Sequence, residues 1–200
     1  MRLPFFLGSA ALLISSTAHA ETYVAFDVDA AYRSGPIHWK SPPAVVLNND
    51  TTPFEIDTHV YGPGFLSHVA VGGTLVDRWA LAAEGGIGGY VVGSGFSWSG
   101  PDMILLARLG ARVERSLGAG FVRGTLGYEW MAFPGGGVSI GTRDNVWQPE
   151  ATAGPYASAS GGVRGSHVGV VGRLDVGRAT STHAVYWPIT VGLGIDFAWR

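Results

Sequence analysis

Acidic and basic side chains recur two or four residues apart within short segments of this 200-residue sequence, and they are its most promising chemical groups. The charged set consists of seven carboxylates and five arginines: Asp27, Asp29, Glu84, Arg108, Arg112, Glu114, Arg123, Glu129, Arg164, Arg173, Asp175 and Asp196. Gathered in one confined space, such groups form either a path for protons and ions or a packed network of ion pairs. Because a buried charge without a partner costs several kcal/mol, we favour a structural network that fills the space.

Groups for covalent catalysis or for binding a cofactor are sparse. The chain has no cysteine, which excludes a disulfide framework, an iron–sulfur cluster and a thiol nucleophile. Ser67 and His68 with Glu84 suggest the site of a lipid-modifying enzyme, but alternation along a strand places Ser67 on the face opposite to the other two. We therefore expect no catalytic, cofactor-binding or metal-binding residue, and we expect that the protein is not an enzyme.

The elements that carry the charged set are eight segments in which large apolar residues alternate with small or polar ones. The final segment, residues 189–199, has Ile189, Leu193 and Phe197 on one face and Thr190 and Asp196 on the other. The eight segments are residues 22–33, 65–76, 79–91, 103–115, 121–132, 155–164, 167–178 and 189–199. This period of two predicts an all-β chain of eight antiparallel strands.

The predicted connections alternate between short and long. Short connections lie near residues 76–78, 116–120 and 165–166, and long ones cover about 34–61, 92–102, 133–154 and 179–186. Such alternation is typical of an up-and-down meander with long loops at one end. Residues 54–58 alternate in the opposite phase, so we expect the second strand to extend back to them past a bulge at Gly62-Pro63-Gly64.

The composition indicates which face of the strands meets water. Charged residues make up 14% of the chain, lysine occurs once, and each strand is long enough to cross a bilayer when tilted. Small and oppositely charged residues suit the narrow interior of an eight-stranded barrel. We therefore predict a closed transmembrane β-barrel with its apolar face toward lipid, its charged set inside, and interfacial anchors among Tyr32, Trp79, Tyr128, Trp130, Trp199 and the tryptophans near the loops (Trp39, Trp98, Trp147 and Trp187).

Residues 1–20 have the pattern of a cleaved signal peptide, which leaves residues 21–200 as the barrel domain. Arg2 precedes an apolar stretch over residues 3–14, and Ala18-His19-Ala20 fits a small-x-small cleavage site. The mature chain resembles the small eight-stranded bacterial outer-membrane β-barrels of the OmpA-like and OmpX-like group. This resemblance implies a Gram-negative outer membrane, long loops facing outward, and insertion by the barrel-assembly machinery, which reads an aromatic residue at the end of the last strand; here Trp199 precedes Arg200.

The favoured function is non-enzymatic: membrane integrity, or surface interaction through the extracellular loops. The expected partners are outer-membrane lipid and lipopolysaccharide, the barrel-assembly machinery and an extracellular ligand of the loops. A formal net charge of −2 gives no basic surface for nucleic acid. A narrow solute or ion channel is the alternative, and a lipid A-modifying enzyme is a weaker one.

Overall fold

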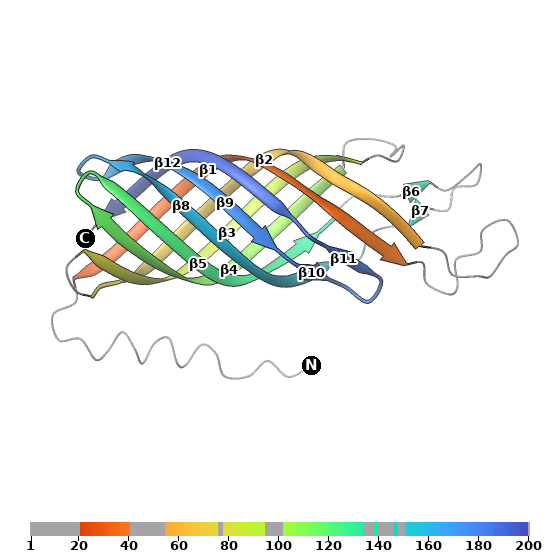
Figure 1. The fold of residues 1–200 in the computed structure, drawn as a ribbon, viewed down its shortest axis with the longest axis horizontal. Helices are drawn as coiled ribbons and strands as arrows, with labels where there is room; N and C mark the ends of the chain where they lie inside the picture. The colour runs from red at the N-terminus through yellow and green to blue at the C-terminus, as the bar shows by residue number, and fades with distance from the viewer. Residues whose placement is uncertain are drawn as a thin grey trace, which may run out of the picture.

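The protein forms a closed β-barrel in the computed structural model, which describes residues 21–40, 55–75, 78–94, 102–133, 138–139, 146–147 and 151–199 (Figure 1). The barrel strands are β1 (Thr22–Lys40), β2 (Glu55–Thr74), β3 (Trp79–Ser94), β4 (Asp102–Leu117), β5 (Gly120–Ala132), β8 (Thr152–Arg164), β9 (Val168–Gly177) and β12 (Ile189–Trp199). Each pairs antiparallel with the next, and β12 pairs with β1 to close the ring. This confirms the predicted eight-stranded, all-β, up-and-down barrel. Within the described ranges, no helix is long and apolar enough to cross a membrane.

Four shorter strands lie at the end of the barrel opposite to the tight turns. β6 (Val138–Ser139) pairs with β7 (Val146–Trp147). β10 (Ala179–Thr180) and β11 (Ala184–Tyr186) continue β9 and β12, because the register is the same on both sides of each interruption: Ile189 faces Val176, and Ala179 faces Tyr186. Pro188 has no N–H to donate to the ladder, which accounts for the break between β11 and β12.

The barrel therefore has two distinct ends. At the turn end, β4 joins β5 at Gly118 and Ala119, and β8 joins β9 through residues 165–167. Gly118 adopts a φ of 71°, a conformation that glycine enters without steric cost. The opposite end, where β1 leads toward β2 and β10 toward β11, is called the loop end below.

The outer surface of the barrel is apolar and its interior is polar along most of its length. Leu126 and Leu193 are 70% and 64% exposed, whereas Asp27 and Glu84 are fully buried. Successive side chains in a strand point to opposite faces, so the alternation seen in the sequence becomes an apolar exterior and a charged interior. An exterior of this kind requires an apolar medium around it.

Two predicted connections and one predicted bulge differ from the structure. β1 and β2 pair residue by residue from Thr22↔Gly73 to Lys40↔Glu55, so the second strand does extend back to residue 55, but without a bulge at Gly62-Pro63-Gly64, and the connection is shorter than residues 34–61. The predicted loop over residues 179–186 is a paired hairpin whose tight turn is closed by the Ser181 N–H donating to the Ala184 carbonyl at 2.8 Å. These predictions were wrong because the strands continue after their outward positions stop being apolar.

The polarity of the sheet inverts at the loop end. Ile37, Trp39 and Val60 point inward and are at most 7% exposed, while His38 and Lys40 face outward. These inward residues belong to an apolar layer that comprises Ala31, Ile37, Trp39, Val60, Leu66, Tyr90, Ile104, Leu106, Met131, Phe133, Ala179, Ala184 and Tyr186. Trp39 is thus an interior residue and not the rim anchor that was predicted. Trp98 and the side chain of Trp147 lie outside the described residues.

Candidate functional site: the interior charge network

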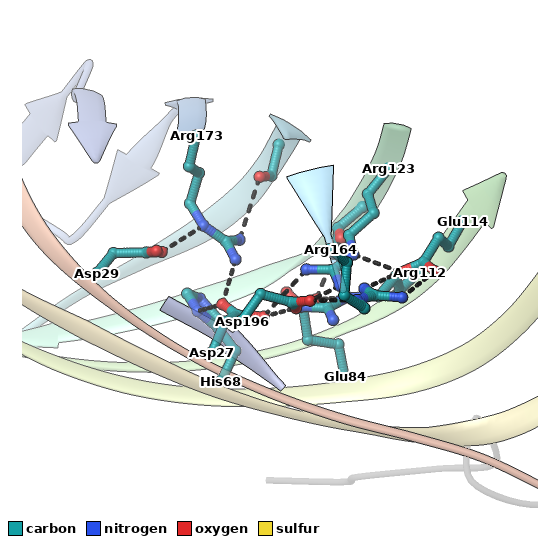
Figure 2. A network of polar contacts seen from close by, with 12 residues as sticks. Asp27, Asp29, His68, Glu84, Arg112, Glu114, Arg123, Arg164, Arg173 and Asp196 are labelled. Carbon is teal, nitrogen blue, oxygen red and sulfur yellow. Dashed lines mark hydrogen bonds and ion pairs between the residues drawn. The ribbon is translucent and has the colours of Figure 1, made fainter. Parts of the chain in front are cut away.

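All twelve members of the predicted charged set point into the barrel, and they come from seven of its eight strands. Eleven of them are at most 5% exposed, and the side chain of Arg164 is 11% exposed at the turn end. The structure adds Arg33 and His68, which are both 1% exposed. These fourteen residues are called the interior charge network, and Figure 2 shows the part of it around Asp27 and Glu114.

Asp27 of β1 is the central carboxylate of the network. Its Oδ1 accepts hydrogen bonds from Arg112 at 2.8 Å and Arg123 at 3.4 Å. Its Oδ2 lies 3.0 Å from Nδ1 of His68 and also pairs with Arg173. One side chain therefore connects β1 to β2, β4, β5 and β9, and of these four strands only β2 is next to β1 in the ring.

Asp27, Asp29 and His68 together have the composition of a metal site, since one ligand atom from each lies within 4.8 Å of the others. Arg173 already supplies the positive charge at this place. Its Nε donates to Asp29 at 2.7 Å, and its terminal amine pairs with Asp27. A guanidinium between two carboxylates supplies the positive charge that a divalent cation would otherwise bring, although Asp29 Oδ1 and His68 Nε2 are buried without a hydrogen-bond partner. We therefore interpret this group as part of the ion-pair network.

The turn end of the network is built around Glu114. Arg123 donates to it at 2.5 Å, Arg164 donates to both of its oxygens at 3.1 and 3.2 Å, and the Tyr23 hydroxyl donates at 2.6 Å. Arg123 and Arg164 also share Asp196. Arg164 contacts both oxygens of Glu114, and Arg123 and Arg164 share Asp196. Such contacts fix both the distance and the orientation of the strands that carry them.

A recess of about 260 Å³ opens into this end from the turns between β4 and β5 and between β8 and β9. Its lining includes Phe121 and Arg164. The guanidinium carbons of Arg123 and Arg164 lie 4.3 and 4.4 Å from the centroid of the Phe121 ring, so aromatic and guanidinium groups stack across the bottom of the recess. The recess therefore ends on the packed network.

Toward the loop end, Arg108 joins two carboxylates. It donates to Glu129 from Nε at 3.1 Å and from a terminal amine at 3.0 Å, and it pairs with Asp175. The face of its guanidinium lies 4.5 Å from the ring centroid of Tyr156, whose hydroxyl donates to Glu84 at 3.4 Å. This tyrosine connects the group around Arg108 to the group around Asp27, because Glu84 also pairs with Arg112.

Arg33 is the main functional residue that the sequence analysis missed. It donates to Glu129 at 2.7 Å and to the Thr190 hydroxyl at 3.2 Å. Its guanidinium lies 5.6 and 5.5 Å from the ring centroids of Tyr90 and Tyr186, two members of the apolar layer. The alternation of the strand does predict an inward Arg33, since it continues the inward positions of Asp27, Asp29 and Ala31. It was overlooked because a loop was expected to start at residue 34.

The network is close to electrical balance. Seven carboxylates face six arginines within the part of the chain that the structure describes, and His68 is the remaining group able to carry a positive charge. The balance matters because each buried ion requires a partner of opposite sign. The arrangement can hold charges fixed and exclude water, which are structural tasks.

The candidate catalytic group does not assemble. Ser67 lies on the outer face of β2, whereas His68 points inward and contacts Asp27. Glu84 is buried and paired with Arg112. A serine nucleophile must share a hydrogen bond with its base, and two residues on opposite faces of one strand cannot do so.

Comparisons with known proteins support the fold. No protein-family model matches the sequence, and no curated protein matches it by sequence. Among solved structures, the outer-membrane protein OprG from Pseudomonas aeruginosa is similar with a TM-score of 0.53 at 8% identity, over 88% of this chain and 96% of that one. Neisserial surface protein A has a TM-score of 0.48 at 11% identity, over 90% and 98% of the two chains. Ail of Yersinia pestis, in complex with the heparin analogue sucrose octasulfate, has a TM-score of 0.46 at 10% identity, over 88% and 99%. The likeness to OprG shows that this chain has the fold of a small outer-membrane β-barrel.

Proposed function

We propose that the mature chain is a closed, non-enzymatic barrel of the bacterial outer membrane, which supports membrane integrity or surface interaction through the segments at its loop end. The apolar exterior faces lipid, and the loop end faces the outside of the cell. Export depends on residues 1–20, and cleavage before Glu21 leaves a chain whose first barrel strand begins at Thr22. N-terminal sequencing of the membrane-inserted protein tests this cleavage. We expect Glu21 to be the first residue.

One observation carries the proposal: the side chains that point into the barrel are buried along most of its length. The interior charge network occupies the middle and the turn end, and the apolar layer occupies the loop end. An eight-stranded barrel has an interior only wide enough for side chains, and wide aqueous pores require about 16 strands. Such a barrel is suited to holding its surface segments in the membrane and not to passing solutes.

Planar bilayers test whether the lumen is closed. The full mature chain is refolded into lipid, and insertion is verified by the difference in gel mobility between heated and unheated samples. We expect no stable single-channel steps, while a trimeric porin in the same bilayers provides the positive control. Reproducible steps from the inserted wild-type chain would establish the narrow channel as its function instead.

The cellular role is tested in a strain that lacks the protein. Permeability to a large antibiotic, the mass spectrum of lipid A, and adhesion to host matrix are measured together. We expect lipid A to be unchanged, because Ser67 lies on the face of β2 opposite to His68 and so cannot use it as a base. A complementing variant with residues 41–54 replaced by a short turn separates the two remaining roles, because it keeps both barrel strands and shortens the connection between them. An acyl chain gained or lost from lipid A on complementation would contradict the non-enzymatic role.

A further inference from the structure

Two of the exposed arginines that the structure describes, Arg115 in β4 and Arg178 directly after β9, each lie over a tryptophan ring. The guanidinium carbon of Arg115 lies 5.2 Å from the centroid of Trp79, and that of Arg178 lies 5.1 Å from the centroid of Trp187. All four side chains are exposed. The other strand arginines point into the barrel, so these two pairs have a separate role.

The two pairs mark opposite ends of the apolar exterior. Trp79 and Arg115 face each other across β3 and β4 at the turn end. Arg178 directly follows β9, whose outward positions include Leu174 and Val176, and it sits opposite Trp187 in the continued register of the β9–β12 hairpin. In a membrane-spanning barrel, these are the levels of the lipid head groups, where tryptophan is favoured.

The guanidinium groups of these pairs lack the partners that the interior arginines have. Among the described residues, no carboxylate oxygen lies within 4.0 Å of Arg115 or Arg178, whereas every arginine of the interior charge network has one. Stacking on the indole uses the face of the guanidinium and leaves its N–H edge free. That edge matches a phosphate in a two-point contact.

The backbone around Arg178 holds the loop-end pair in place. The Arg178 N–H donates to the Pro155 carbonyl at 3.0 Å, and the Trp187 N–H donates to the Pro36 carbonyl at 3.1 Å. Both prolines are exposed on the outer face and lie on the strands that flank the hairpin. The pair therefore sits on a rigid part of the wall between two uncharged side chains, open toward the surrounding lipid.

We propose that Arg178 and Trp187 form a binding site for a phosphate group of a lipid of the leaflet that surrounds the loop end. The proposal rests on the proposed membrane-spanning role. Arg178 binds the phosphate through its N–H edge, and Trp187 orients the guanidinium and contacts the sugar or glycerol part of the head group. Arg115 and Trp79 form the equivalent contact in the opposite leaflet.

Lipid retention measured by native mass spectrometry tests this site. The full mature chain in a maltoside detergent is mixed with lipid A that carries two phosphates or with the same lipid after enzymatic dephosphorylation. To isolate the loop-end site, the measurement uses a background in which Arg115 is replaced by glutamine. We expect phosphorylated lipid to be retained about fivefold better, the size of effect that one basic group at a membrane surface provides. Arg178→Gln should abolish that preference, and Lys40→Gln should leave it unchanged because Lys40 pairs with Glu55 at 3.1 Å.

Two further measurements separate the possible outcomes. Trp187→Leu keeps the charge and removes the stacking surface, so it should reduce the phosphate preference without reversing it; this variant also serves if Arg178→Gln does not fold. Inorganic phosphate at millimolar concentration should compete only weakly if the site requires a lipid. Equal retention of both lipids, or an unchanged preference in Arg178→Gln, would overturn this inference alone. A wild-type chain that does not insert into vesicles would instead overturn the proposed membrane role.

Discussion

At the residue scale, Asp27 shows why the interior charges act as one unit. Its two oxygens contact Arg112, Arg123, Arg173 and His68, and each of these arginines has at least one further carboxylate partner. Removing the charge of Asp27 therefore weakens the compensation of several guanidinium groups at once, in a site with no exposure to water. In such a network the cost of breaking a pair exceeds the net benefit of having formed it.

This asymmetry predicts a large effect for a nearly isosteric change. Asp27→Asn should lower the free energy of unfolding by about 3–5 kcal/mol, because three buried guanidinium groups lose one of their negative partners at the same time. Urea unfolding of the refolded barrel in lipid vesicles, followed by tryptophan fluorescence, measures this change.

The matched control is Asp57→Asn on the outer face of β2. Asp57 pairs with His38 at 2.7 Å, but its side chain is 83% exposed. Exposed ion pairs contribute about 1 kcal/mol or less, so this variant should unfold almost as the wild type does. Equal effects of the two substitutions would show that the interior carboxylate is not held in a cooperative network.

The membership of the network could be predicted from the sequence, but its pairings could not. Because successive side chains in a strand point to opposite faces, the sequence position alone places Asp27, Glu84 and Asp196 on the same side of the sheet. Which carboxylate meets which arginine depends on the stagger of eight strands around the ring, and Arg33 with Glu129 or Arg173 with Asp29 are brought together only by closure. Arg33 itself was missed because a strand boundary was drawn one residue after it.

At the element scale, the inversion of polarity explains the errors in strand length. From the turn end to Tyr32 and Tyr61, the outward positions of β1 and β2 are mostly apolar. Between these tyrosines and the loop end, the outward residues include His38, Lys40 and Asp57. β1 and β2 are therefore lipid-facing strands that continue as the wall of a water-facing barrel, and Figure 1 shows them reaching beyond their neighbours. A sequence pattern that changes phase without a turn is easily read as a loop.

Single cysteines test this inversion, since the chain has none of its own. His38→Cys should react rapidly with a water-soluble maleimide, because that position faces water outside the barrel. Ile37→Cys should react slowly, because position 37 is 7% exposed and faces the apolar layer. Labelling is measured by mass spectrometry on protein in vesicles, with Leu193→Cys as the lipid-facing control. Faster labelling at position 37 than at position 38 would contradict the assigned orientation.

Close backbone approach near Pro188 makes a second prediction at this scale. A Cβ added to Gly35 would lie 2.2 Å from the Trp187 carbonyl oxygen and 2.9 Å from Cα of Pro188, so the strands would have to separate. Gly35→Ala should therefore reduce the free energy of unfolding by about 1–3 kcal/mol, as overpacking does elsewhere.

Gly124 provides the comparison for that substitution, because a Cβ there would meet nothing within 4 Å. Gly124→Ala should leave stability unchanged or slightly raised, since it restricts the unfolded chain without a clash. Thermal unfolding of both variants under the same conditions measures the difference. If Gly35→Ala were as stable as Gly124→Ala, β1 and β12 would not be packed as closely as the structure shows.

At the scale of the whole molecule, the lumen is closed by two unlike layers in series. The interior charge network fills its part of the lumen with paired, buried side chains. The apolar layer excludes water because an apolar space too small for hydrogen-bonded water stays dry. Arg33 joins the layers, since it pairs with Glu129 while lying between the rings of Tyr90 and Tyr186. The fold class was predictable from alternation, and the presence of charge inside from alternation together with composition and strand length. The apolar layer was not, because seven of its thirteen residues lie in segments that were predicted to be loops: Ile37, Trp39, Val60, Phe133, Ala179, Ala184 and Tyr186.

Because the interior charge network and the apolar layer block the lumen one after the other, we predict that disrupting one of them does not make the barrel conduct. Glu84→Ala with Arg112→Ala removes one charge of each sign and leaves a hydrated space in the network, while Trp39→Ala with Tyr186→Ala removes two large side chains from the apolar layer. Each double variant should remain without conductance in planar bilayers, because the other layer still blocks the lumen. The quadruple variant should show small, fluctuating currents. Conductance from the Glu84–Arg112 double variant alone would mean that the apolar layer is no barrier to ions. An absence of current from a correctly inserted quadruple variant would mean that the remaining side chains suffice to close the lumen of an eight-stranded barrel.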